Sequence, residues 1–99
     1  MNEDNWTALH IAAEKGLTEV CLALLKDERF TKVDAVDKYD KKTALHIACE
    51  EGFEAVARAL ISADPSLLRG VSRSGHTPLE LARERDFGSL ARRLEALLV

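Results

Sequence analysis

The chain has 99 residues and carries 14 lysines and arginines against 17 aspartates and glutamates, for a net charge of −3. This length allows one domain, and a composition of 46% hydrophobic and 31% charged residues excludes a disordered or collagen-like chain. No apolar run approaches the roughly 18 residues of a membrane span, and the N-terminus has no signal-peptide pattern. Cys21 and Cys49 lack CxxC spacing and are expected to be reduced and buried. We therefore expect an intracellular protein of the cytoplasm or nucleus, without a membrane partner.

The charges are unevenly distributed along the chain. Residues 1–66 contain 8 basic and 13 acidic residues, whereas residues 67–99 contain 6 basic and 4 acidic ones. Binding to nucleic acid usually requires a dominant basic stripe and a pI above about 9, but the pI of this chain is 5.6. Nucleic acid is therefore not expected as a partner.

A short motif occurs three times. The sequence TALHIAA begins at Thr7, TALHIAC begins at Thr43 and TPLELAR begins at Thr77, so the spacings are 36 and 34 residues. Self-similarity with a period of this length is typical of repeat architectures. The chain is therefore expected to consist of three similar units.

Each motif predicts a short helix that begins directly after its threonine. Threonine is a good N-cap residue, and Pro78 stands at the first helical position, where its missing N–H is not needed. Nine residues after each threonine comes a helix stop: Gly16, Gly52 and, less regularly, Asp86. Glycine readily adopts the left-handed conformation that ends a helix, and an apolar residue follows each stop.

A second helix is expected in each unit, near residues 19–26, 54–62 and 89–98. The apolar residues in these segments recur with helical spacing. Nothing in the connecting segments has the pattern of a long strand. Each unit is therefore two short helices joined by a tight turn, and the fold class is all-α.

The motifs, stops and helix lengths together resemble the ankyrin repeat family, whose repeat has about 33 residues and a TPLHxA signature. The resemblance covers the whole chain as one domain, residues 1–99, with repeats at about 2–36, 37–71 and a cap-like 72–99. It implies an all-α ankyrin-repeat solenoid of three helix-turn-helix repeats, in which short connectors project as fingers roughly perpendicular to the helices.

The fingers depart from the family pattern. The family usually has a glycine two residues before the motif threonine, and only Gly75 matches. Asn5 can adopt the left-handed conformation at modest cost, whereas Lys41 would be strained in it. We therefore expect the second finger to be one residue out of register near Lys41.

Two histidines, His10 and His46, occupy the same position in successive motifs. In ankyrin-like stacks the motif threonine and histidine form hydrogen bonds to the neighbouring finger, so the resemblance implies a structural role. A zinc site formed with Cys21 and Cys49 is not expected, because neither cysteine has a ligand partner at a suitable spacing. Glu80 replaces the histidine in the third motif, which fits a last repeat without a successor.

No catalytic motif is present. The chain has no GxSxG elbow, no cysteine beside an obvious base and no glycine-rich loop before a helix. Glu50 and Glu51 are adjacent and therefore do not share a helix face, so they do not suggest paired acid/base carboxylates. We expect no enzymatic activity, no cofactor and no metal.

A protein-interaction module is the function that the resemblance implies, with a rigid concave groove formed by the fingers and the first helices. The partner is expected to be a protein or peptide, with a basic segment lying over Glu14, Glu50 and Glu51. The Trp6 ring has a structural alternative, which is to pack on the adjacent finger. The predicted partner-binding residues are Trp6, Glu14, Lys15, Tyr39, Lys42, Glu50, Glu51, Arg73, His76 and Arg85.

Both ends of the stack carry apolar residues. Leu22 has Arg58 and Arg92 as its counterparts, so an N-terminal neighbour or a second copy is expected to cover Leu22 and Trp6. At the other end, the apolar residues 97–99 suggest that the terminus packs against another surface. The alternative function, which the start of the chain inside a finger favours, is a structural or regulatory ankyrin fragment of a larger protein whose activity lies elsewhere.

Overall fold

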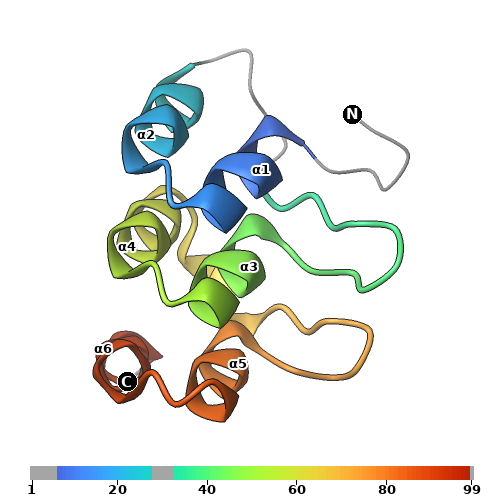
Figure 1. Cartoon of the computed structure of the whole chain (residues 1–99), viewed down its shortest axis with the longest axis vertical. Helices are drawn as coiled ribbons and strands as arrows, with labels where there is room; N and C mark the ends of the chain where they lie inside the picture. Colours follow the sequence, from blue (N-terminus) through green and yellow to red (C-terminus); the bar gives the residue numbers. More distant parts are fainter. Residues whose placement is uncertain (1–6, 28–32, 99) are drawn as a thin grey trace.

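The structure is a computed structural model that describes residues 7–27 and 33–98. The expectations for Asn5 and Trp6 lie outside the described residues. Figure 1 shows the α-helices stacked in pairs, one pair for each repeat. Their bounds are α1 Ala8–Lys15, α2 Thr18–Lys26, α3 Ala44–Glu51, α4 Glu54–Ala63, the 3-10 helix η1 Pro65–Arg69, α5 Pro78–Glu84 and α6 Gly88–Leu98. The described part contains no strand, which confirms the predicted all-α solenoid.

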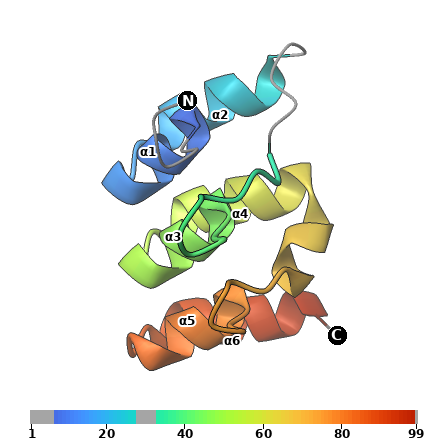
Figure 2. The ribbon, with the colours of Figure 1, turned by 90° about the vertical axis from the view of Figure 1, so that its right-hand side faces the viewer.

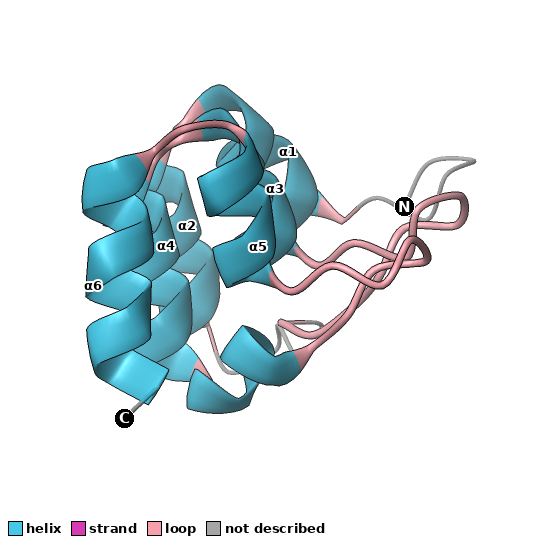
Figure 3. Cartoon of the chain, turned by 90° about the horizontal axis from the view of Figure 1, so that it is seen from below, coloured by secondary structure: helices cyan, strands magenta, loops and turns pink. Residues whose placement is uncertain are grey.

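The stack has layers, which Figure 3 shows end-on. The second helices α2, α4 and α6 form one layer, the first helices α1, α3 and α5 form the next, and the connecting loops project beyond them as fingers. Within the layers α1 packs on α3, α3 packs on α5 and α2 packs on α4, whereas α6 approaches α4 less closely. The repeats therefore form one continuous solenoid, which Figure 2 shows after a 90° turn about the vertical axis.

The motif threonines cap the first helices. The hydroxyl oxygen of Thr43 accepts a hydrogen bond from the His46 backbone N–H at 3.3 Å, and Nδ1 of His46 accepts from the Thr43 N–H at 3.1 Å. The first repeat forms the same capping box. In the third repeat the Glu80 carboxylate replaces the histidine ring and accepts from the Thr77 N–H at 3.0 Å. Glutamate at this position therefore retains the part of the interaction that lies within its own repeat.

The helix stops adopt the expected left-handed conformation. The φ angle is 70° at Gly16, 79° at Gly52 and 65° at Asp86. At both glycines there is a second restriction, because the phenylalanine of the following repeat lies directly against the backbone. A side chain is tolerated at Asp86, where no described phenylalanine fills the space.

The core lies between the two layers of helices and repeats with the sequence motif. Leu9 and Leu45 of the first helices and Val56, Leu60 and Leu94 of the second helices are fully buried. Because each repeat buries its apolar face against its neighbours, the core is a series of interfaces along the stack.

The last repeat carries a charged residue where the others have small apolar ones. Ala13 and Cys49 are fully buried, whereas Arg83 at the equivalent position is exposed and forms an ion pair with Glu95 on α6. The substitution of arginine for a small residue thus places a charged pair on the surface of the third repeat.

Candidate partner-binding surface

Each described finger is closed at its base by a polar side chain. In the second finger, residues 33–42, the Asp37 N–H donates to the Lys42 carbonyl at 3.1 Å, and Asp37 Oδ1 accepts from the Lys42 N–H at 2.7 Å. In the third finger, residues 70–76, the Ser72 N–H donates to the His76 carbonyl at 2.9 Å, and Ser72 Oγ accepts from the His76 N–H at 3.3 Å. Asp37 and Ser72 therefore play the same role.

The Asp37 carboxylate is held in its charged form. Its burial opposes ionisation, but the backbone N–H groups of Asp40, Lys42 and Tyr39 donate to it and lower its pKa overall. The second finger is thus organised around one ionised side chain.

The register of the second finger differs from the expectation in one respect. Lys41 has a φ angle of 53° and Gly75 has one of 85°, and each lies two residues before its threonine. Lys41 therefore occupies the position expected of the family glycine, and the predicted shift of register at this residue is wrong. Lys41 adopts the strained left-handed conformation. The additional residue lies nearer the tip, because Asp37 stands six residues before Thr43 whereas Ser72 stands five before Thr77.

The motif histidines tie each first helix to the next finger, as the resemblance implied. Nε2 of His10 lies 3.0 Å from the Lys42 carbonyl oxygen, and Nε2 of His46 lies 3.1 Å from the His76 carbonyl oxygen. In His46, Nδ1 accepts from the Thr43 N–H, so the ring is neutral and carries its proton on Nε2. Burial lowers the pKa of His46, which favours this neutral form.

The second and third fingers are also bonded to each other. The Arg73 N–H donates to the Asp40 carbonyl at 2.8 Å, and Arg73 Nη2 donates to the Lys38 carbonyl at 3.3 Å. Tyr39 at the tip of the second finger is 60% exposed, with the Lys38 ammonium 5.6 Å from its ring centroid. The fingers thus hold an aromatic ring in solvent on a backbone that is fixed.

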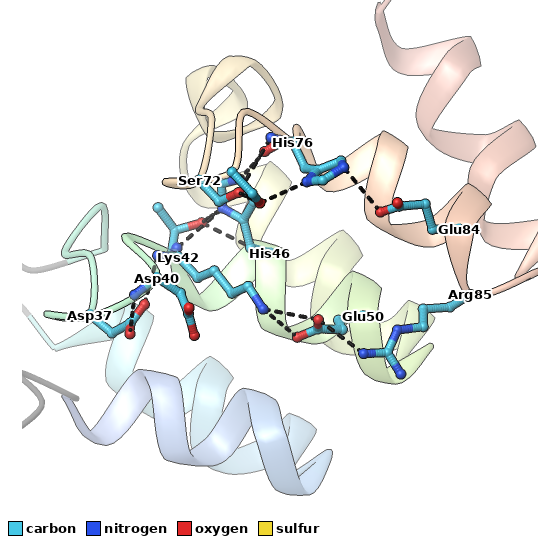
Figure 4. A network of polar contacts seen from close by, with 11 residues as sticks. Asp37, Asp40, Lys42, His46, Glu50, Ser72, His76, Glu84 and Arg85 are labelled. Atoms are coloured by element: carbon cyan, nitrogen blue, oxygen red, sulfur yellow. Dashed lines mark hydrogen bonds and ion pairs between the residues drawn. The ribbon is translucent and has the colours of Figure 1, made fainter.

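Three of the predicted residues form one ion network, shown in Figure 4. Lys42 Nζ lies 2.9 Å and 3.1 Å from the two carboxylate oxygens of Glu50, and Arg85 Nη2 lies 3.2 Å from Oε2 of the same group. The Lys42 and Glu50 side chains are only 19% and 17% exposed. Glu50 on α3 therefore joins the second finger to the C-cap residue of α5, and it is not a free outward-facing carboxylate.

A similar pair occurs in the third repeat. His76 Nε2 lies 3.3 Å from Glu84 Oε2, and His76 Nδ1 lies 2.8 Å from Ser74 Oγ. His76 is one of the predicted partner-binding residues, whereas its pairing with Glu84 was not predicted. The signal was present, because Lys42 with Glu50 and His76 with Glu84 occupy the same two positions of the repeat.

The other predicted residues are less closely connected. Glu14 and Lys15 end α1, Glu51 ends α3, and all three are exposed. Trp6 lies outside the described residues. We refer to the second and third fingers together with the outward sides of α1, α3 and α5 as the finger–helix surface. The structure thus brings Lys42, Glu50 and Arg85 together, connects Arg73 to the neighbouring finger, and leaves Glu14, Lys15 and Glu51 separate.

Comparison with protein families agrees with this geometry. A model of three copies of the ankyrin repeat matches residues 29–94, and a single ankyrin repeat model matches residues 4–38. The chain belongs to the ankyrin repeat family. Ankyrin repeats are generally modules of protein–protein interaction, and the family is typically non-catalytic. No curated protein matches the sequence.

The described part of the ankyrin stack offers no membrane-spanning helix and no metal cluster. Within residues 7–27 and 33–98, no helix is long and apolar enough to cross a membrane, and no three His, Cys, Asp or Glu residues cluster so that they could hold a metal ion. Burial raises the pKa of Cys49 to about 12 and also raises that of Cys21. Both thiols are therefore protonated near neutral pH and are poor nucleophiles and ligands.

The first ankyrin repeat exposes residues whose counterparts are buried. Val20 is 44% exposed, whereas Val56 at the same position of the second repeat is fully buried. Ile11 is exposed whereas its counterparts Ile47 and Leu81 are buried. Leu17 is exposed as well, and its counterparts Phe53 and Phe87 lie against the helix-stop glycine of the preceding repeat. Ile11, Leu17 and Val20 form the apolar end face of the first repeat; Leu22 is exposed too, but its counterparts Arg58 and Arg92 are likewise exposed.

Proposed function

We propose that the finger–helix surface binds a protein or peptide partner and carries out no catalysis. The observation that carries this proposal is the set of bonds that tie one repeat to the next: those from His10 and His46 to the following fingers, and that from Arg73 to Asp40. A surface that is already rigid loses little conformational entropy on binding, so more of the contact energy appears as affinity.

Exposed side chains on this rigid surface supply the contacts in the proposal. Tyr39 is an aromatic anchor of the kind that is enriched at the centres of interfaces. The Lys42–Glu50–Arg85 network fixes its side chains before binding, so they lose less conformational entropy when a partner binds. Among the described residues, Glu14 and Glu51 are exposed carboxylates outside this network, and a basic segment of the partner would lie over them rather than over Glu50.

An intracellular location, in the cytoplasm or the nucleus, belongs to the same proposal. It is supported by Cys21 and Cys49, which are both buried free thiols. Structural free cysteines are typical of reducing compartments.

A capture experiment tests this function. The full chain is immobilised and used to capture proteins from a lysate of its source, next to a Trp6→Ala and Tyr39→Ala double variant and an Arg92→Ala control on the exposed side of α6. We expect specific partners on the wild type and on the control, with much lower recovery on the double variant. Equal recovery on all three, with unchanged helicity by circular dichroism, would place the binding elsewhere on the chain.

The alternative function is a structural or regulatory part of a larger protein, and the apolar end face of the first repeat favours it. In this proposal an N-terminal neighbour or a second copy covers Leu22 and Trp6. Sedimentation equilibrium at high concentration, with Leu22→Arg as the variant, tests it. We expect self-association or low solubility of the wild type that the arginine relieves. A strict monomer whose solubility and stability the substitution leaves unchanged contradicts it.

A further inference from the structure

A groove opens on the other side of the molecule, where α4, η1 and the end of α6 meet. Three hollows adjoin one another around Leu97, and the largest has a volume of about 400 Å³. Figure 2 shows the C-terminal end of α6 beside η1, and Figure 3 places it in the helix layer that lies away from the fingers. We refer to this site as the α4–α6 groove; its lining includes Arg58, Ile61, Pro65, Leu68, Arg69 and Leu97.

The floor and the edge of the groove are apolar. Ile61 and Leu68 are almost fully buried and form the floor, whereas Leu97 is 53% exposed at the edge. The groove exists because α6 approaches α4 less closely than α2 does, while η1 packs beside α4. The gap accepts one apolar side chain, which would cover Leu97 and exclude water from the floor.

The rim of the groove is positively charged. Arg58, Arg69 and Arg93 line the three hollows, and no aspartate or glutamate does. Arg93 lies 2.6 Å from Glu54, but no described carboxylate pairs with Arg58 or Arg69. Lys42 and Arg85 on the finger–helix surface share the carboxylate of Glu50, whereas Arg58 and Arg69 have no such partner among the described residues. In a chain with a net charge of −3, this face therefore has charge available for an anionic partner.

We propose that the α4–α6 groove binds a short peptide segment in which an apolar side chain is flanked by aspartate or glutamate. The apolar side chain enters the hollow beside Leu97, and the flanking carboxylates meet Arg58 and Arg69, whose planar guanidinium groups suit bidentate recognition of carboxylates. A peptide fits better than a membrane surface, since the apolar residues form a recess between the arginines. Membrane binding instead requires apolar side chains that project from a basic face.

Selection from a peptide library tests the proposal. The full chain is used to select from a phage-displayed library of random peptides, and the most enriched peptide is labelled for fluorescence anisotropy. We expect enrichment of sequences with a leucine, isoleucine or phenylalanine between acidic residues. Arg58→Glu and Arg69→Glu should each weaken binding by about tenfold or more, Leu97→Ser should weaken it as well, and added NaCl should lower the affinity.

Arg92→Glu is the matched control. Arg92 occupies the same position of the third repeat that Arg58 occupies in the second, and it is exposed on α6 but does not line the groove. It makes the same change in net charge and should leave the affinity within about twofold, as expected for a charge outside the contact area. Thermal unfolding by circular dichroism checks that all variants remain folded.

Four results would overturn the proposal. The first two are that the library yields no binding peptide, or that the enriched peptides lack acidic residues. The third is that Arg92→Glu weakens binding as much as Arg58→Glu does. The fourth is that Tyr39→Ala abolishes binding while Leu97→Ser leaves it unchanged. The last result would place the peptide on the finger–helix surface. Co-sedimentation with phosphatidylserine vesicles tests the membrane alternative. If the chain binds vesicles in a way that needs Arg58 and Arg69 but binds no peptide, the groove is a membrane-binding site.

Discussion

The ring of Phe53 lies so close to Gly16 that a Cβ atom built on the glycine would come within 2.9 Å of the ring. Gly52 and Phe87 repeat this relationship at 2.8 Å one repeat later. The glycine that ends a first helix is therefore also a contact surface for the next repeat. Two separate restrictions, the left-handed backbone and the neighbouring ring, apply to one residue.

Gly16→Ala should accordingly destabilise the chain more than an alanine at a glycine with backbone strain alone. Gly75 is the matched control, since its φ angle is 85° but a Cβ there would meet nothing within 4 Å. We expect a loss of about 1–2 kcal/mol for Gly75→Ala and roughly 1–3 kcal/mol more for Gly16→Ala, because the ring is displaced. Urea denaturation measures both. Equal losses would show that Phe53 moves aside freely.

Lys41→Gly should stabilise the chain. Lys41 is held in the left-handed conformation by the bonds that close the second finger, including that from its own N–H to the Asp37 carbonyl. A non-glycine residue in this conformation costs about 1–2 kcal/mol, and the greater freedom of glycine in the unfolded chain removes part of the gain. We expect a net increase of about 0.5–1 kcal/mol in the free energy of unfolding. A loss of stability would mean that the lysine side chain makes contacts that outweigh the strain.

Acid should destabilise the fold through His46. Burial lowers the pKa of His46 below its ordinary value near 6.5, and a proton on Nδ1 would face the Thr43 N–H donor. The stability from the neutral ring is therefore complete above about pH 6.5, where neither state binds the proton. As the pH falls below this value the unfolded chain is protonated first, and the free energy of unfolding decreases by up to about 1.4 kcal/mol per pH unit.

His46→Gln is the variant that isolates this effect. Glutamine retains a donor for the His76 carbonyl and an acceptor for the Thr43 N–H, but it does not titrate. Urea denaturation between about pH 5 and 8, the range in which histidine titrates, should give a shallower pH dependence for the variant than for the wild type. Identical slopes would show that His46 contributes nothing to the acid sensitivity.

Glu50 should be coupled more strongly to Lys42 than to Arg85. The Lys42–Glu50 pair is largely shielded from water and involves both carboxylate oxygens, whereas Arg85 is mostly exposed. Exposed ion pairs contribute about 0.2–1 kcal/mol, and we expect the Lys42–Glu50 coupling to lie at or above the top of this range. Double-mutant cycles with Glu50→Gln, Lys42→Met and Arg85→Met measure both couplings. A larger coupling to Arg85 would contradict the geometry.

The repeats could be predicted from the sequence because their signals are local. Threonine caps, helix stops and apolar spacing depend on residues within a few positions of one another, so the motif at Thr43 predicts α3 wherever the unit lies in space. The role of His46 followed from the family resemblance. The partner-binding residues remain a prediction, and the sequence pattern does not show that Glu50 is shielded and paired with Lys42 whereas Glu51 is exposed.

The sequence by itself determined the number of repeats, the six α-helices of the described residues and the threonine caps, since these are properties of short stretches of chain. Only the tertiary structure decided that Glu50 joins Lys42 to Arg85, that Phe53 lies against Gly16, and that a groove with unpaired arginines opens beside Leu97. These features depend on the distance and rotation between successive repeats. Those quantities arise from the packing of whole side-chain layers, which short-range sequence patterns do not specify.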